Sequence, residues 1–249
     1  MVLDEVFRVE AFPLPDTKTE ASDYVTVGGG CVRVPGARSP VSAIIVDAAG
    51  RRSIATYRDL RLTEAAPRQP QKLVAAADGV LIDNRMPKFA RPIGEAARAR
   101  GIPTVLDADK PTDARDPLFA VASHVVFSGE CLRATAGTND LAAAIERMGR
   151  LTGGFVAVTD GAGDVLWRDG GRVQRMPAFK IAAVDTLAAG DVFHGAFTLA
   201  VVEGLPIADA LRFAAAAAAV KCERFGGSAT APRRAEVEAF LRQRARRVT

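Results

Sequence analysis

Four short apolar segments recur along the middle of the chain, and each is separated from the next by a stretch of helical character. They are residues 80–82, 104–106, 124–127 and 155–158. Strands that alternate with helices form an open, mostly parallel sheet flanked by helices. Ligands of such sheets bind at the carboxyl ends of the strands. The pattern therefore predicts an α/β fold whose functional site lies along one edge of a mostly parallel sheet.

The pattern changes before residue 60. Residues 24–27 read as a strand, and residues 43–46 and 53–57 flank a turn and predict an antiparallel hairpin. At 249 residues and 49% hydrophobic, the chain can bury one large core and still form a small appendage. We expect residues 1–60 to form mainly a β appendage and the approach to the core, and residues 61–249 to form the α/β core itself.

Several classes of protein are disfavoured by residue usage. The cysteines Cys31, Cys131 and Cys222 lack the spacing of a metal or redox site, so a reducing cytoplasm fits best. His124 and His194 are too few for a histidine-built metal site or a Ser-His hydrolase. No uncharged apolar run approaches the length of a membrane span, and the amino terminus lacks the pattern of a signal peptide. We expect neither a membrane protein nor an exported one.

The net charge of +4 is concentrated in the C-terminal tail. One explanation is a nucleic-acid-binding surface. The spacing of apolar residues around 237–241 is explained more simply by an amphipathic final helix with a solvated arginine face, and no aromatic platform accompanies it. We therefore expect no nucleic-acid partner. The tail arginines are Arg233, Arg234, Arg242, Arg244, Arg246 and Arg247.

The most informative segment is residues 185–198. Residues 179–184 read as a strand and residues 192–203 have apolar residues at helical spacing, so Ala188, Ala189 and Gly190 form a strand-to-helix turn. Side chains no larger than a methyl group let backbone N–H groups approach an anion, and the helix N-terminus adds its positive dipole end.

Asp191, in the first turn of that helix, is placed to accept the proton of a hydroxyl that attacks phosphorus. The alternative is that Asp191 only caps the helix and that the small residues only turn the chain. His194 follows three residues later on the same helix, where packing is its expected role and the edge of the site is the alternative.

Residues 185–196 resemble the C-terminal signature of the ribokinase-like (phosphofructokinase B type) carbohydrate kinases, D-T-x-G-A-G-D followed by a small-residue helix. Ala188 stands where glycine is usual. The resemblance extends in family order from about Ser39 to Leu241. It implies a ribokinase-like, Rossmann-like mostly parallel sheet with a small antiparallel β lid that covers the sugar and often pairs with a second subunit. The lid would make the protein a homodimer.

The resemblance also implies an activity and a nucleotide site. An ATP-dependent kinase of this kind would transfer the γ-phosphate to a primary hydroxyl of a ketose sugar, with Asp191 as base and Ala188, Ala189 and Gly190 as the anion hole. Residues 155–161 resemble the strand that ends in the nucleotide-contacting T-x-G pattern, and residues 215–227 resemble the helix and glycine turn beside the adenine. The nucleotide-binding residues implied are Thr159, Gly161, Thr186, Lys221, Gly226 and Gly227.

Metal ions follow from the chemistry and from the resemblance. Magnesium is expected to sit largely on phosphate oxygens and water, with Glu130 the nearest carboxylate to the family's N-x-x-E motif. Asp185 and the Leu187 carbonyl resemble part of a site for a monovalent cation such as K⁺ in potassium-activated relatives.

The substrate is less constrained. The chain is closest in style to the 6-deoxy-6-sulfofructose kinases, in which the positions of Lys18 and Arg85 contact the sulfonate; a guanidinium and an ammonium suit an anionic sugar. Composition alone equally allows two exposed basic side chains. The other implied sugar contacts are Asp4, Gly28 and Gly29. Fructose, another ketose, ribose and a sugar phosphate remain open, as does a non-catalytic sugar or nucleotide sensor on the same fold.

One segment departs from the family. Gly28, Gly29 and Gly30 are followed at once by Cys31, where relatives have a helix and further strand and helix units. Either the protein lacks part of its sheet, or residues are missing from the sequence between Gly30 and Cys31. We favour the second explanation, because deleting core strands from one domain leaves unpaired edges and an uncovered apolar face.

Overall fold

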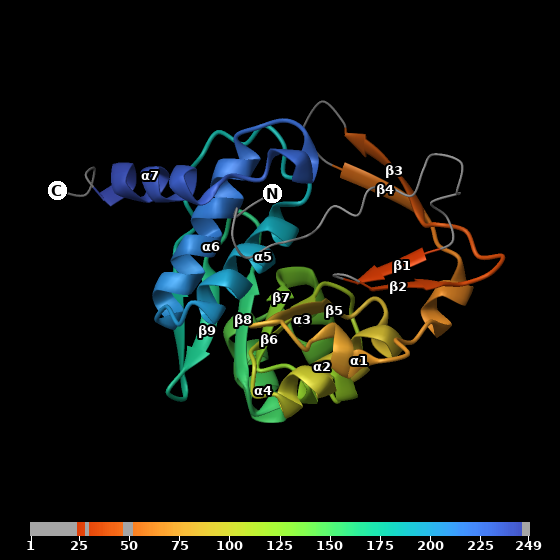
Figure 1. The fold of residues 1–249 in the computed structure, drawn as a ribbon. Coiled ribbons are helices and arrows are strands. Elements are labelled where there is room, and N and C mark those ends of the chain that lie inside the picture. Colours follow the sequence, from red (N-terminus) through yellow and green to blue (C-terminus); the bar gives the residue numbers. More distant parts are fainter. Residues whose placement is uncertain (1–23, 28–29, 47–51, 246–249) are drawn as a thin grey trace.

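The structure is a computed structural model, and it describes residues 24–27, 30–46 and 52–245 (Figure 1). Asp4, Lys18, Gly28 and Gly29, which were predicted to contact the sugar, lie outside the described residues.

A six-stranded sheet forms the core of the described chain, in the order β10-β9-β8-β7-β6-β5. The four strands from β5 to β8 are parallel, and β9 and β10 continue the sheet as an antiparallel hairpin. The parallel strands coincide with the four apolar segments, so the predicted α/β fold is confirmed; the hairpin was not predicted. The bounds are β5 Val80–Asp83, β6 Thr104–Ala108, β7 His124–Ser128, β8 Phe155–Thr159, β9 Val165–Asp169 and β10 Arg172–Met176.

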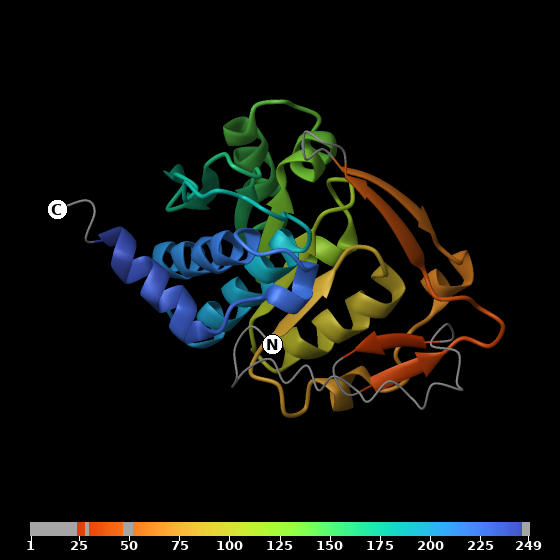
Figure 2. The same ribbon diagram turned by 90° about the horizontal axis from the view of Figure 1, so that it is seen from above.

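Helices pack on both faces of the sheet because successive side chains of a strand point to opposite faces. Leu106, Val125 and Phe127 pack in one buried cluster with α2 (Pro87–Ala99), α3 (Gly129–Ala136) and α4 (Leu141–Thr152). Val105 and Val126 point the other way, into a cluster with α5 (Ala189–Val202), α6 (Ile207–Cys222) and α7 (Arg234–Ala245). Figure 2 shows α5, α6 and α7, in cyan and blue, gathered on one side of the molecule. The short helices are η2 Leu60–Glu64, α1 Pro70–Leu73, η3 Pro117–Ala120 and η4 Gly227–Thr230.

Two small antiparallel sheets precede the core and lie beside it (Figure 1). One pairs β1 (Tyr24–Val27) with β2 (Gly30–Arg33), and the other pairs β3 (Val41–Val46) with β4 (Arg52–Tyr57). The predicted strands and hairpin are therefore present. The division of the chain at residue 60 stays a prediction.

Gly30 and Cys31, the point at which the sequence departs from the family, begin a strand. Both residues belong to β2, and their register with β1 runs from Val27 opposite Gly30 to Thr26 opposite Cys31 without a break. The explanation that we favoured from the sequence, an omission of residues between Gly30 and Cys31, stays a prediction.

The segment before α5 differs from expectation. Residues 179–184 were predicted to be a strand, but they lie outside any strand. The backbone N–H groups of Val184 and Asp185 both donate to the Cys222 carbonyl oxygen, at 2.8 and 3.1 Å, and the Phe179 ring packs edge-on to Phe240 with centroids 5.2 Å apart. This segment therefore packs against α6 and α7 instead of pairing with a strand. The helix itself begins at Ala189, earlier than the predicted Val192.

Candidate active site

The turn into α5 is shaped by Ala188. Its φ and ψ of 61° and 15° lie in the left-handed region, and it is the one described non-glycine residue with a positive φ. A left-handed residue reverses the chain sharply and lets the next residue start a helix. The Ala188 carbonyl oxygen accepts the first hydrogen bond of that helix, from the Val192 N–H at 3.0 Å. Gly190 is exposed, and a Cβ built on it meets no atom within 4 Å. The turn therefore leaves open space next to a helix N-terminus.

Asp191 lies in the first turn of α5 and is exposed, whereas the nine residues that follow it are all buried. The apolar face of α5 fixes the helix on the sheet, so it also fixes the direction in which Asp191 leaves the core. The placement fits the predicted base, an accessible carboxylate beside backbone donors.

Asp185 connects the turn to the end of α6. Its Oδ1 accepts from the Leu187 N–H at 2.8 Å, and its Oδ2 accepts from the N–H groups of Gly227 at 2.9 Å and Gly226 at 3.2 Å. These bonds, that from Gly227 foremost, hold the pKa of Asp185 well below its usual range. Gly226 and Gly227 have φ of 133° and 57°, values that favour glycine, so the glycine turn brings two N–H groups to one carboxylate.

Lys221 contacts the same aspartate from the last turn of α6. Its side chain is 0% exposed, and its Nζ donates to the Asp185 carbonyl oxygen at 2.8 Å and lies 3.2 Å from Oδ2. A buried side chain has no surface to offer a nucleotide, so the nucleotide contact predicted for Lys221 does not match its placement. The Asp185 oxygens that the sequence suggested for a monovalent cation are in contact with this ammonium group.

His194 is buried and joins α5 to the sheet. Its Nδ1 lies 2.7 Å from the Gly190 carbonyl oxygen, and its Nε2 lies 3.2 Å from the Val126 carbonyl oxygen and 3.4 Å from Asp107 Oδ1. The packing role expected for His194 holds, with an addition: the ring bonds to the backbone of the predicted anion hole.

Sequence reasoning missed a group of carboxylates at the carboxyl ends of β5 and β6. Burial raises the pKa of Asp107 to about 6, and the negative charges of Asp109, Asp191 and Asp83 act in the same direction, while the nearby His194 opposes them. Asp107 Oδ1 and Asp109 Oδ1 are buried and have no hydrogen-bond partner among the described residues. The signal was present in the sequence, because carboxylates that follow a buried parallel strand lie where ligands bind.

Arg85, the predicted sulfonate contact, is the second residue after β5 and is partly buried. Its guanidinium makes an ion pair with Asp109, and its backbone N–H donates to Asp83 Oδ1 at 2.8 Å. Nearby, the Asn84 side chain donates to the Lys110 carbonyl oxygen at 2.6 Å. Arg85 is therefore at the carboxyl edge of the sheet, as predicted, and already has an anionic partner there.

The predicted phosphate corner follows β8. Thr159 ends the strand, and Gly161 has a φ of 60° in a turn that the Gly163 N–H closes onto the Asp160 carbonyl oxygen at 2.8 Å. Arg133 of α3 holds this turn through two bonds to the Asp160 carboxylate, at 2.6 and 3.2 Å. The ion pair ties the turn to α3. Glu130 is exposed in the first turn of the same helix, and Thr186 is exposed before α5.

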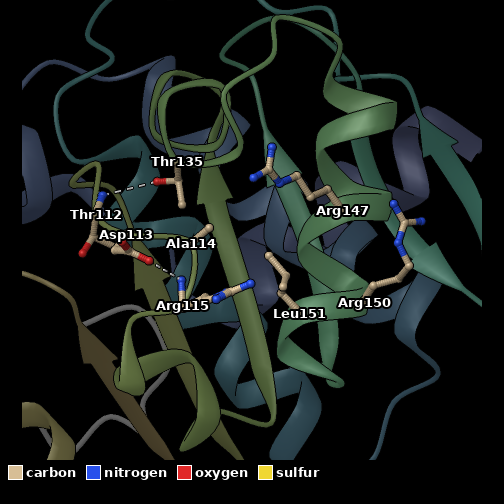
Figure 3. A pocket seen from close by; sticks show the side chains of 8 residues that line it. All are labelled: Thr112, Asp113, Ala114, Arg115, Thr135, Arg147, Arg150 and Leu151. Atoms are coloured by element: carbon tan, nitrogen blue, oxygen red, sulfur yellow. Dashed lines mark hydrogen bonds between the residues drawn. The ribbon is translucent and has the colours of Figure 1, made fainter.

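A cavity of about 560 Å³ opens elsewhere, between the loop after β6 and helices α3 and α4 (Figure 3). None of the predicted site residues lines it, so it is separate from the turn into α5. Its lining residues are Thr112, Asp113, Ala114, Arg115, Thr135, Arg147, Arg150 and Leu151.

Comparison with known proteins agrees with the geometry. Residues 29–234 match the pfkB family of carbohydrate kinases. The chain belongs to this family. The ribokinase-like resemblance is therefore confirmed, while its narrower form, a likeness to sulfofructose kinases, is not.

Individual pfkB relatives match parts of the chain. A candidate ribokinase from Agrobacterium tumefaciens has a structure that superposes with a TM-score of 0.79 at 38% identity, over 85% of this chain and 70% of that one. The ribokinase of Haemophilus influenzae is 26% identical over 76% of this chain and 63% of its own length. That of Lactococcus lactis is 40% identical over 34% of this chain and 29% of its own length. The alignments with these two curated relatives thus span less than two thirds of their length.

No group of three or more His, Cys, Asp or Glu side chains forms a metal site among the described residues. The Asp107 and Asp109 oxygens that accept no hydrogen bond from the described residues nevertheless fit a magnesium ion that keeps its water and takes its other ligands from phosphate. None of the helices in the described part of the chain combines the length and hydrophobicity that a membrane span requires.

Proposed function

We propose that this protein is an ATP-dependent kinase that transfers the γ-phosphate to a hydroxyl group of a sugar. The observation that carries the proposal is the exposed Asp191 directly after a left-handed turn of small residues, in a chain of the pfkB family. A base beside preorganised N–H donors is what an in-line phosphoryl transfer requires.

Asp191 would accept the proton of the attacking sugar hydroxyl. The N–H groups of the turn, at Ala188, Ala189 and Gly190, would bind the negative charge that develops on the phosphoryl oxygens. His194 bonds to the Gly190 carbonyl and so restrains the turn. Thr159 and Gly161 would contact nucleotide phosphate, with Thr186, Gly226 and Gly227 nearer the rest of the nucleotide. Magnesium would neutralise phosphate charge, close to Asp107, Asp109 and Glu130.

Release of ADP by the purified protein tests this mechanism. Asp191→Asn is expected to lower kcat by about 100-fold or more while ATP still binds, because general-base catalysis contributes about 10²- to 10⁴-fold. Asp209→Asn is the matched control, since Asp209 is an exposed aspartate in the first turn of α6. Retained turnover in Asp191→Asn would remove Asp191 from the role of base.

The sugar is the narrower part of the proposal. Assay of ribose, fructose, fructose 6-phosphate and 6-deoxy-6-sulfofructose at equal concentrations would rank them. A sulfonate would have to compete with Asp109 for the Arg85 guanidinium, so a neutral ketose or ribose fits the present pairing better. If the sulfonated sugar is preferred, Arg85→Gln should raise its KM and leave that of fructose unchanged. Binding of sugar and ATP without ADP production would instead support the sensor.

Dimerisation through the β lid and a cytoplasmic location also belong to the proposal. Val41 and Tyr57, which lie opposite each other on β3 and β4, expose 66% and 53% of their surface and share one face of this sheet, an apolar surface that a second copy would cover. A monovalent cation at Asp185, as in potassium-activated relatives, would have to share its oxygens with Lys221. Sedimentation equilibrium measures the oligomeric state. A monomer across the micromolar range would reject the dimer.

A further inference from the structure

Lys221 is a fully buried lysine. Transfer of an ammonium group out of water is costly, and buried lysines are found where a partner compensates for the lost hydration. Among the residues that the structure describes, the partner here is Asp185, which offers both its backbone carbonyl oxygen and its carboxylate. The two residues are 36 positions apart in the sequence, so the contact joins separate parts of the fold.

The contact joins the end of α6 to the segment before α5. Besides Lys221, the N–H groups of Leu187, Gly226 and Gly227 converge on the Asp185 carboxylate. A Cβ built on Gly227 would lie 3.4 Å from the Leu187 side chain, so the two segments already touch. Asp185 stands three residues before the left-handed Ala188, and its position therefore sets where the turn begins.

We propose that Lys221 is a positioning residue for phosphoryl transfer: its ammonium is a built-in cation that fixes Asp185, and through Asp185 the turn that carries the anion hole and Asp191. This inference rests on the proposed kinase function. It goes further, because it makes the geometry of the catalytic turn depend on the buried ammonium group of Lys221, which is not exposed to a substrate. It also predicts that the turn needs no added monovalent cation, since the Asp185 oxygens are already in contact with the Lys221 Nζ.

If Lys221 had a purely structural role, the expected result would differ. Removing it would loosen α6 and lower stability, as any truncation in this helix does, without a selective effect on the chemical step. Val220 gives the matched control, because it is the preceding residue of α6, is 6% exposed and contributes no polar atom.

The experiment compares Lys221→Met and Val220→Ala with the wild type by ADP release and by hydrogen exchange of backbone amides. Lys221→Met is expected to lower kcat by about 100-fold, the effect of misplacing catalytic groups by about 1 Å, with little change in the KM for ATP. The amides of Leu187, Gly226 and Gly227 should exchange faster in Lys221→Met than in Val220→Ala. Equal kcat values for Lys221→Met and the wild type, or unchanged exchange at the three amides, would overturn the inference.

The wild type alone supplies a test that does not depend on a folded variant. Its rate is expected to stay the same when KCl is replaced by tetramethylammonium chloride, whose cation is too large for the site. Loss of most of the rate would show that an external cation does what we assign to Lys221. If the wild type releases no ADP with any sugar, the proposed function has failed, and hydrogen exchange still decides whether Lys221 holds the turn.

Discussion

Ala188→Gly is expected to stabilise the protein, although glycine weakens the interior of a helix. At φ 61° and ψ 15°, Ala188 occupies a conformation that costs an L-residue about 1–2 kcal/mol and costs glycine almost nothing. Two terms oppose the gain. The unfolded chain acquires entropy worth about 0.4–1 kcal/mol with glycine, and the half-buried methyl group is lost at a cost of about 0.4 kcal/mol. The net stabilisation is about 0.5 kcal/mol.

The neighbouring Ala189 is the matched control. It has a negative φ as the first residue of α5, so Ala189→Gly gains nothing from the backbone and should destabilise by about 0.5 kcal/mol. The two variants thus differ by about 1 kcal/mol, or about 2–4 °C in Tm for a chain of this length. Ala188→Val extends the series, because a β-branched residue in the left-handed region should be the least stable of all.

Thermal and urea unfolding at pH 7.5 measure the series, with ADP release to check that the turn still works. The N–H of residue 188 remains in every variant, so turnover should change far less than in Asp191→Asn. The reasoning is refuted if Ala188→Gly is less stable than the wild type, or if both glycine variants shift in the same direction by the same amount.

Two further predictions concern the edge of the sheet and the phosphate corner. The pKa of Asp107 is about 6 in the folded protein and 3.8 ordinarily, so between these pH values the folded protein keeps a proton that the unfolded chain has lost. The free energy of unfolding should therefore fall by up to roughly 3 kcal/mol as pH rises from about 4 to 6. Urea titrations should show that Asp107→Asn abolishes this fall. Gly129→Ala should weaken ATP binding, because a Cβ there would lie 2.1 Å from Asp160 Oδ1 and push the turn after β8 away. Arg133→Met, which breaks the ion pair to Asp160 without crowding, should have a smaller effect, and equal affinities in calorimetry for Gly129→Ala and the wild type would reject this account.

Much of the architecture can be predicted from short segments of the sequence. The strands β5 to β8 are short apolar runs between turn residues, and the alternation of Val105 with Leu106 and of Val125 with Val126 divides them between two helical layers. The prediction of a strand at residues 179–184 was wrong for a related reason. An apolar run can be buried by helices as well as by a sheet, and only the packing of Phe179 on Phe240 shows which applies here.

The sequence by itself determined the chemistry at the start of α5. Small residues followed by Asp191 and an apolar helix produce an exposed carboxylate beside a helix N-terminus through local geometry, since residues a few positions apart must lie together. Only the tertiary structure decided which polar groups from distant parts of the sequence contact one another. Arg85 and Asp109 are 24 residues apart, Asp185 and Lys221 are 36, and His194 and Val126 are 68. The contacts of Asp185 and His194 are set by the packing of α5 and α6 against the sheet, and that of Arg85 by the pairing of β5 with β6. Burial in the same packing raises the pKa of Asp107.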